Sequence, residues 1–199
     1  SGLYKTEDGG ISYTKIDGAP NGNDLLFLDS LVGYIGSNTI YKTTDGGNNW
    51  YAVNGVPGGV GKIFFVNFQV GWAVGGGNIY KTTDGGENWA LNFNAPGSIS
   101  FTNIHFVDTL YGWTANINGR PFKTTDGGLN WIQQTNLDIW QSLDVFFKDY
   151  LKGFLLESNK LYRTTNGGIT FNLMPDITGF SIAGRLSIYS DSTIFITGY

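Results

Sequence analysis

One acidic side chain recurs in the same short sequence context, which raises the question of acid–base chemistry. The context is the decapeptide YKTTDGGNNW at residues 41–50, and related decapeptides begin at residues 4, 80, 122 and 162. The acidic residues are Asp8, Asp45, Asp84 and Asp126, and Asn166 takes this place in the last copy. Two carboxylates held close together can hydrolyse a glycosidic bond, but these are about 40 residues apart in the chain. We therefore expect each carboxylate to lie in its own repeat without pairing, and Asn166 indicates that the position requires no charge.

Other catalytic chemistries lack the residues they need. The chain has no cysteine and a single histidine, His105, so it lacks the ligands of a typical zinc site. We expect His105 to be a buried or pore-lining imidazole. No Gly-x-Ser-x-Gly elbow and no phosphate loop is present. The sequence thus predicts no catalytic residue, no metal and no cofactor. A glycan-active enzyme, the alternative, would have to draw its carboxylates from Asp17, Asp138, Glu157 and Asp176.

The decapeptides belong to a repeat of about 40 residues. A second element, FVDTLYGW at residues 106–113, recurs at residues 27–34, 65–72 and 147–154, and a degraded copy begins at residue 188. In one repeat the pattern predicts four strands, at residues 62–67, 71–75, 78–83 and 87–93, with glycines at the joints. Four antiparallel strands per repeat are typical of a β-propeller blade. We predict an all-β, five-bladed β-propeller that forms a single domain over residues 1–199.

The two ends of the chain match one interrupted repeat. The last repeat stops after STIFITGY at residues 192–199, and the chain begins with SGLYKTEDGG. Joined tail to head, these segments resemble the continuous sequence at residues 71–86. We expect the termini to share one blade, because closing the ring in this way removes exposed sheet edges.

Each residue type of the decapeptide has a structural role. Asp45 follows a predicted strand and can accept hydrogen bonds from the backbone of its own turn. Gly46 and Gly47 provide positive φ angles without steric cost, and the ring of Trp50 can fold over the turn. We assign this structural role to Asp8, Asp45, Asp84, Asp126 and Asn166, and to Trp50, Trp89 and Trp131.

The same residues resemble a known repeat. Thr43-x-Asp45-x-Gly47-x-x-Trp50, with copies at Thr82, Thr124 and Thr164, is similar to the Asp-box of the BNR repeat. That box occurs in sialidases, sortilin-type receptors and secreted bacterial propellers. Together with FVDTLYGW, the pattern most resembles propellers related to the photosystem II assembly and stability factor. The resemblance implies that the box locks a hairpin away from the ligand site.

The chain departs from the functional subfamilies that carry this box. Sialidases use an arginine triad, and this chain has three arginines in all, Arg120, Arg163 and Arg185. Arg163 occupies the position that lysine holds in the other decapeptides, which we interpret as a position on the blade surface. The photosystem II assembly factors are expected to have seven blades and an arginine-rich patch, neither of which this sequence predicts. The resemblance therefore predicts the fold and leaves the function open.

Charge and hydropathy restrict the partners. The net charge is −4 and the 12 basic residues form no cluster, so nucleic-acid binding is disfavoured. No apolar run approaches the length of a membrane span. The absence of cysteine and the abundance of Asn, Thr and Gly favour an exported bacterial protein at an extracellular, cell-surface or periplasmic location. Because the sequence begins at Ser1 without Met, we expect either a mature form or one part of a larger multidomain chain.

Residues that break the repeat in the segments between blades are the candidates for ligand binding. They are Trp140, Arg120, Phe101, Phe180 and Arg185. An exposed tryptophan beside polar side chains suits a sugar ring or a peptide, although Trp140 could instead cap the core of its blade, or residues 136–143 could shift the strand register. We predict a non-catalytic binding or scaffold module that recognises a protein or a glycan. The alternative is a purely structural unit of a larger surface assembly.

Overall fold

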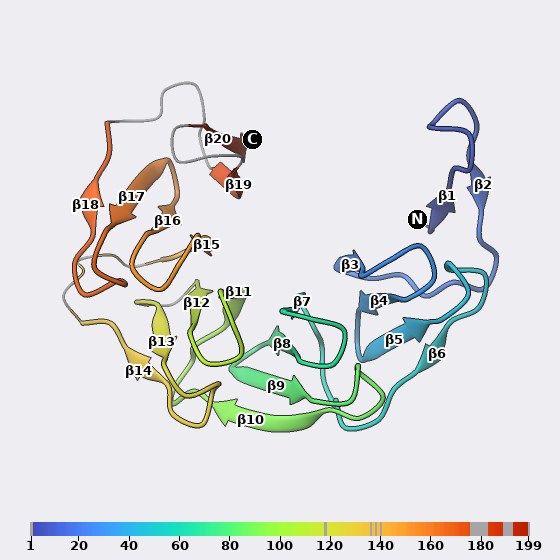
Figure 1. Cartoon of the computed structure of the whole chain (residues 1–199), viewed down its shortest axis with the longest axis horizontal. Coiled ribbons are helices and arrows are strands. Elements are labelled where there is room, and N and C mark those ends of the chain that lie inside the picture. Colours follow the sequence, from blue (N-terminus) through green and yellow to red (C-terminus); the bar gives the residue numbers. More distant parts are fainter. Residues whose placement is uncertain are drawn as a thin grey trace. The chain divides into compact units, whose positions relative to one another are not determined.

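The computed structural model describes residues 2–117, 119–135, 137, 139, 141–175, 183–188 and 193–198. These residues form strands joined by turns, without a helix among them (Figure 1). Four sheets of four strands follow one another along the chain, preceded by one two-stranded sheet and followed by another. A helix capable of spanning a membrane is therefore absent from the described residues.

In each full sheet, the order of the strands in space follows their order in the chain. The first sheet contains β3 (Asp24–Phe27), β4 (Gly33–Gly36), β5 (Ile40–Thr43) and β6 (Tyr51–Ala52). The second contains β7 (Lys62–Phe65), β8 (Gly71–Gly75), β9 (Asn78–Thr82) and β10 (Ala90–Asn94). The third contains β11 (Phe101–Phe106), β12 (Gly112–Asn116), β13 (Phe122–Thr124) and β14 (Ile132–Gln133). The fourth contains β15 (Asp144–Phe147), β16 (Gly153–Glu157), β17 (Lys160–Thr164) and β18 (Asn172–Leu173). The prediction of four-stranded repeats is confirmed.

Two shorter sheets correspond to the two parts of the interrupted repeat. β1 (Tyr4–Lys5) pairs with β2 (Thr14–Lys15), and β19 (Ala183–Ile188) pairs with β20 (Ile194–Gly198). By sequence, β19 and β20 match the first two strands of a repeat, and β1 and β2 match the last two. That the two pairs join into one blade stays a prediction.

Contacts along the chain divide it into two compact units. One comprises residues 1–73 and 80–91, and the other comprises residues 74–79 and 92–199. The core of the first unit gathers Tyr34, Ile63, Trp89 and neighbouring aliphatic side chains, and Tyr34 stacks on Phe65 with ring centroids 4.6 Å apart. In the second unit Trp113 stacks on Phe147 at 3.6 Å. Each stack joins two successive sheets within its unit.

The recurring Phe…Gly pair of each repeat has a packing cause. Phe27 at the end of β3 is paired with Gly33 at the start of β4. A Cβ added to Gly33 would lie 2.7 Å from the Phe27 ring, so only glycine allows the ring to lie across the neighbouring strand. Gly71, Gly112 and Gly153 meet the phenylalanines of their own sheets in the same way.

The turn between the first two strands of a sheet is tied to the decapeptide of the same sheet. Asp29 Oδ1 accepts hydrogen bonds from the backbone N–H groups of Leu31 and Val32 at 2.8 and 2.6 Å. The Leu31 carbonyl in turn accepts a hydrogen bond from the Gly46 N–H at 2.9 Å. Gly85, Gly127 and Gly167 make the corresponding bond in the next three sheets. The decapeptide turns and the first-to-second-strand turns therefore lie at the same end of each sheet.

Candidate functional site

The repeated carboxylates are engaged within their own turns. In the decapeptide at residues 80–89, the Thr82 hydroxyl donates to Asp84 Oδ1 at 2.8 Å and accepts from the Gly86 N–H at 2.9 Å. Asn88 donates to Asp84 twice, from its backbone N–H at 3.0 Å and from its side-chain amide at 2.9 Å. Hydrogen bonds of the same kind hold Asp8, Asp45, Asp126 and Asn166. We call these five turns the decapeptide hairpins.

These hydrogen bonds keep the hairpin carboxylates ionised. The side-chain and backbone donors of Asn49 lower the pKa of Asp45 to about 2, and those of Asn88 do the same for Asp84. The donors of Asn130 also lower the pKa of Asp126. A general acid needs the opposite shift, a pKa raised toward the working pH, so the hairpin carboxylates are unsuited to donate protons.

The hairpin tryptophans close over their turns. Trp50 Nε1 donates to the Gly47 carbonyl at 2.9 Å, and Trp89 Nε1 donates to the Gly86 carbonyl at 3.2 Å. Trp131 differs, because its Nε1 donates to Asn92 Oδ1 at 3.4 Å. Trp89 and Trp131 are buried and Trp50 is half-buried.

The lysine of the decapeptide is not a surface residue in every repeat. Lys42 is buried: its Nζ donates to the Gly85 carbonyl at 2.8 Å and lies 2.6 Å from Glu87 Oε1. The hydroxyl of Tyr34 donates to the same Gly85 carbonyl at 2.7 Å. Only Arg163 in the corresponding position is exposed as expected. Our interpretation of this position as blade surface was wrong for Lys42, because the neighbouring hairpin covers it.

His105 is held as a structural imidazole. Its Nε2 lies 2.7 Å from the Phe147 carbonyl oxygen, and its ring centroid is 4.6 Å from that of Phe146. Burial lowers the His105 pKa to about 4, so the ring is neutral at pH 7 and donates from Nε2. Among the described residues, no three His, Cys, Asp or Glu side chains gather to hold a metal ion.

The five predicted ligand-binding residues have different surroundings. Phe101 is buried, with its ring 6.5 Å from that of Phe93 and 5.9 Å from that of Phe122. The structure thus places Phe101 in the core, where the rings of Phe93 and Phe122 pack against it, and not on a binding surface. Arg120 is half-buried and its Nε donates to the Leu137 carbonyl, while Arg185 is exposed on β19. Trp140 and Phe180 lie outside the described residues.

Arg185 belongs to a repeat position that sequence reasoning missed. This position lies in the first strand of each repeat, three residues before the recurring phenylalanine (Ile188 in the last repeat), and it holds Asp24, Lys62, Asn103, Asp144 and Arg185. Asp24 Oδ1 lies 3.0 Å from Lys62 Nζ, and Asp24 Oδ2 accepts from the Ile63 N–H at 2.8 Å. Asn103 donates to Asp144, which also accepts from the Leu186 N–H. An alignment of the five repeats could have revealed this position, because each repeat has a polar residue there.

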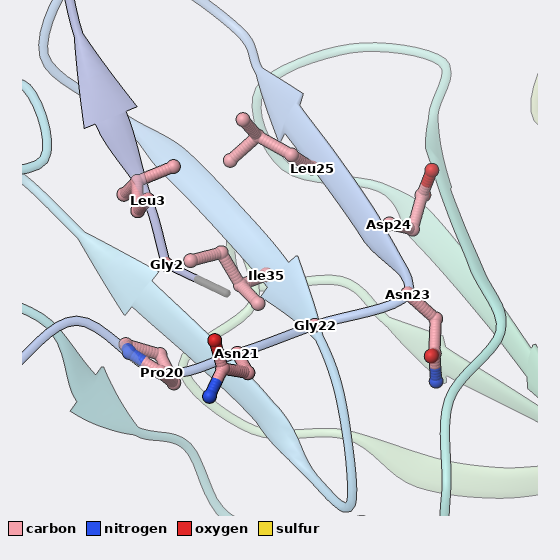
Figure 2. Close-up of a pocket in the computed structure, with 9 residues that line it drawn as sticks. All are labelled: Gly2, Leu3, Pro20, Asn21, Gly22, Asn23, Asp24, Leu25 and Ile35. Atoms are coloured by element: carbon pink, nitrogen blue, oxygen red, sulfur yellow. The ribbon is translucent and has the colours of Figure 1, made fainter.

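A pocket of about 280 Å³ lies beside the first inter-blade segment, residues 16–24. In Figure 2, the aliphatic side chains of Leu3, Leu25 and Ile35 gather on one side of it. Pro20, Asn21 and the backbone of Gly22 form the opposite rim, whereas Asn23 and Asp24 point away from the aliphatic side chains. A Cβ on Gly22 would lie 2.3 Å from the Ile35 side chain, so the segment approaches β4 as closely as glycine permits.

The residues that line the pocket include one carboxylate and no histidine, lysine or arginine. Asp24, its one carboxylate, is held by Lys62 and by the Ile63 N–H. Of the carboxylates considered for a glycan-active enzyme, Glu157 accepts a hydrogen bond from the Tyr162 hydroxyl at 2.9 Å and Asp17 lies 3.9 Å from Lys15. Asp138 and Asp176 lie outside the described residues. The pocket suits an aliphatic side chain with amide groups beside it.

Comparison with known proteins identifies the architecture. No protein-family model and no curated protein matches the chain. Among solved structures, YCF48 bound to D1 peptide is similar with a TM-score of 0.76 and 22% identity, over 98% of this chain and 68% of that one. YCF48 from Cyanidioschyzon merolae gives a TM-score of 0.72 and 17% identity, over 97% and 72%. Both neighbours share the predicted β-propeller fold.

Other solved structures with this fold are different kinds of protein. The WD40 β-propeller domain of Doa1 gives a TM-score of 0.66 and 12% identity, over 89% of this chain and 61% of that one. The GH74 enzyme of Niastella koreensis gives a TM-score of 0.72 and 18% identity, and the chain spans 38% of the length of that enzyme. The predicted fold class is therefore confirmed: the chain is an all-β protein with the β-propeller fold and about five blades.

Proposed function

We propose that the chain is a non-catalytic binding module that recognises a protein partner through its inter-blade segments. The observation that carries this proposal is the pocket beside residues 20–24, which offers aliphatic side chains and amide groups but no uncommitted carboxylate. Peptides present this combination of apolar side chains and backbone hydrogen-bonding groups. YCF48, a structural neighbour, has been solved bound to a peptide, which supports the same ligand class here.

The proposal includes the wider setting expected from the sequence. We place the module in a secreted, cell-surface or periplasmic bacterial protein, where an oligosaccharide would be a second ligand class for the inter-blade segments. Trp140 and Arg120 are the residues we assign to such a ligand, since an aromatic ring and a guanidinium group suit a sugar as well as a peptide. The Asp-box assignment of the decapeptide hairpins belongs to the same proposal.

Peptide and glycan arrays probed with the labelled chain would test this function, followed by calorimetry on each hit. Leu25→Ser removes an exposed aliphatic side chain from the pocket, and Leu31→Ser is the matched control because Leu31 is exposed to a similar extent, at 55% against 50%. Trp140→Phe tests the inter-blade segment that contains Trp140. We expect saturable binding that is weakened at least about tenfold by Leu25→Ser or Trp140→Phe and unchanged by Leu31→Ser.

Two outcomes would overturn the proposal. If no array member bound, the chain would be a structural unit of a larger assembly. If an oligosaccharide were cleaved, with products visible by mass spectrometry, the chain would be an enzyme like the GH74 neighbours.

A further inference from the structure

Two further pockets lie at equivalent positions of two decapeptide hairpins, but the charged side chains that line them differ. In the second unit, a pocket of about 600 Å³ is lined by residues that include Lys123, Thr125, Asp126, Ile132 and Ile169. In the first unit, a pocket of about 340 Å³ is lined by the repeat equivalents Lys5, Glu7, Asp8, Thr14 and Asn48. Both pockets are thus the groove between one decapeptide hairpin and the next, and their lysine is the second residue of the decapeptide.

Lys5 and Lys42, which both hold the second position of their decapeptides, each have a carboxylate partner. Lys5 Nζ lies 2.9 Å from Glu7 Oε1, supplied by its own hairpin. Lys42 Nζ lies 2.6 Å from Glu87 Oε1, supplied by the following hairpin. The two carboxylates come from different positions of the decapeptide, the fourth and the eighth, so either position can neutralise the lysine.

Lys123 has neither of these partners. The fourth residue of its own decapeptide is Thr125, and the eighth residue of the following decapeptide is Ile169. Lys123 Nζ donates to the Gly167 carbonyl at 2.8 Å and lies 5.4 Å from the centroid of the Trp113 ring. Within the described part of the chain, Lys123 forms no ion pair. Burial lowers the pKa of Lys123, in keeping with an ammonium group that is desolvated without a carboxylate beside it.

The walls of this groove are apolar where those of the groove at Lys5 are polar. Ile132 and Ile169 expose 68% and 58% of their surfaces, whereas Thr14 and Asn48 stand in the corresponding places of the first groove. Asp126, the other charged group of the pocket, is held by Asn130 and Thr124. The groove therefore combines one cation that lacks a carboxylate, two exposed aliphatic side chains and a volume within the range of ligand pockets.

We propose that the groove of Lys123, Ile132 and Ile169 binds a peptide segment in which an acidic side chain stands next to aliphatic ones. The ligand carboxylate takes the place that Glu87 occupies beside Lys42, and the aliphatic side chains cover Ile132 and Ile169. The charge complementarity follows from Lys5 and Lys42, which hold the same decapeptide position and each lie beside a carboxylate. This groove shares no residue with the pocket beside residues 20–24, so it is a second site, beyond the proposed function.

The test compares two synthetic pentapeptides by NMR. One is acetyl-Gly-Leu-Glu-Leu-Gly-amide, and the other has Gln in place of Glu. We expect the Glu peptide to shift the methyl resonances of Ile132 and Ile169 in a saturable way, and the Gln peptide to bind about fivefold more weakly, the effect of one partly exposed ion pair. Equal dissociation constants for the two peptides would overturn the proposal.

Substitutions at the hairpin tip separate charge from packing. Ile169→Glu supplies an internal carboxylate like that of Glu87, so we expect it to abolish binding of the Glu peptide. Ile169→Gln, the matched control, removes the same aliphatic group without adding charge and should keep part of the binding. Both changes lie at an exposed position, and thermal unfolding checks that the fold is kept. The proposal would be contradicted if the Ile169→Glu variant bound the Glu peptide as tightly as the Ile169→Gln variant does.

Variants of the other pocket keep the two proposals distinguishable. Leu25→Ser should bind the Glu peptide as the unmodified chain does, because Leu25 lines only the pocket beside residues 20–24. Loss of binding in Leu25→Ser, with Ile169→Glu unaffected, would assign the peptide to that pocket and overturn the second site.

Discussion

At the scale of single residues, the hairpin carboxylates act as hydrogen-bond acceptors. Asp84 accepts from Thr82 and twice from Asn88, while Asn166 accepts from Thr164 and donates to Thr170 Oγ1. The ninth residue of each decapeptide is thus matched to the fifth. Where the fifth residue is aspartate, the ninth is an asparagine or serine that donates to it, and where the fifth is asparagine, the ninth is a threonine that accepts from it. This matching explains why the fifth copy functions without a charge, which the sequence indicated but could not explain.

The pKa of Asp84 makes its contribution to stability depend on pH. Its folded-state pKa of about 2 lies below its ordinary value of 3.8, so the contribution is fully present above about pH 4 and is lost as the pH falls toward 2. Asp84→Asn, which does not titrate, should lower the melting temperature by about 2–4 °C at pH 7. Melting curves of both proteins from pH 7 to pH 2 should converge at the acid end. A constant difference over this range would contradict the account.

His105 gives a second, separate pH dependence. Its folded-state pKa of about 4 lies below the ordinary value of 6.5, so the neutral ring stabilises the fold above pH 6.5, and this contribution declines as the pH falls toward 4. Since the ring is only partly shielded from solvent, we expect a loss of about 1–2 kcal/mol. His105→Gln should remove this component, measured by urea unfolding at pH 7 and pH 5. A variant with the same pH dependence as the unmodified chain would show that His105 is not its source.

At the scale of the elements, one hairpin carbonyl in each of the two units joins neighbouring sheets. Tyr34 and Lys42 both donate to the Gly85 carbonyl, and Trp113 and Lys123 both donate to the Gly167 carbonyl. The aromatic residue comes from the second strand of a sheet and the lysine from the third. One pair of donors therefore holds the next hairpin at a fixed place.

Removing one of these donors tests how much the hydrogen bonds to the Gly85 carbonyl stabilise the contact between neighbouring sheets. Tyr34→Phe deletes the hydroxyl that donates to the Gly85 carbonyl at 2.7 Å in a buried setting. We expect a loss of about 1–1.5 kcal/mol in the free energy of unfolding, the usual contribution of such a bond. Tyr41→Phe in the neighbouring strand is the control, for which we expect a change within about 0.5 kcal/mol. Equal effects of the two variants in urea unfolding would argue against this stabilisation.

The strands themselves follow closely from the repeat pattern. β8 matches the predicted residues 71–75, and β7 and β9 differ from prediction only at their ends. The fourth strand was predicted at residues 87–93, but β10 begins at Ala90 because Asn88 and Trp89 are used by the hairpin. The burial of Lys42 could not be predicted, because its partners Gly85 and Glu87 lie more than 40 residues away in the chain.

At the scale of the whole molecule, repetition predicts the fold but not the function. Solved structures with the same fold include YCF48 bound to a peptide and GH74 enzymes, so the activity has to be read from residues that the repeats do not share. The pocket beside residues 20–24 and the groove at Lys123 both arise in this way. Neither followed from the sequence, because each depends on side chains that different strands and hairpins bring together.

The central claim is that the repeated carboxylates hold hairpins and perform no chemistry. An NMR titration of the aspartate carboxyl carbons measures this directly. We expect pKa values of about 2 for Asp45 and Asp84 and a lowered pKa for Asp126. A hairpin carboxyl that titrates near neutral pH, as a general acid would, would contradict the central claim.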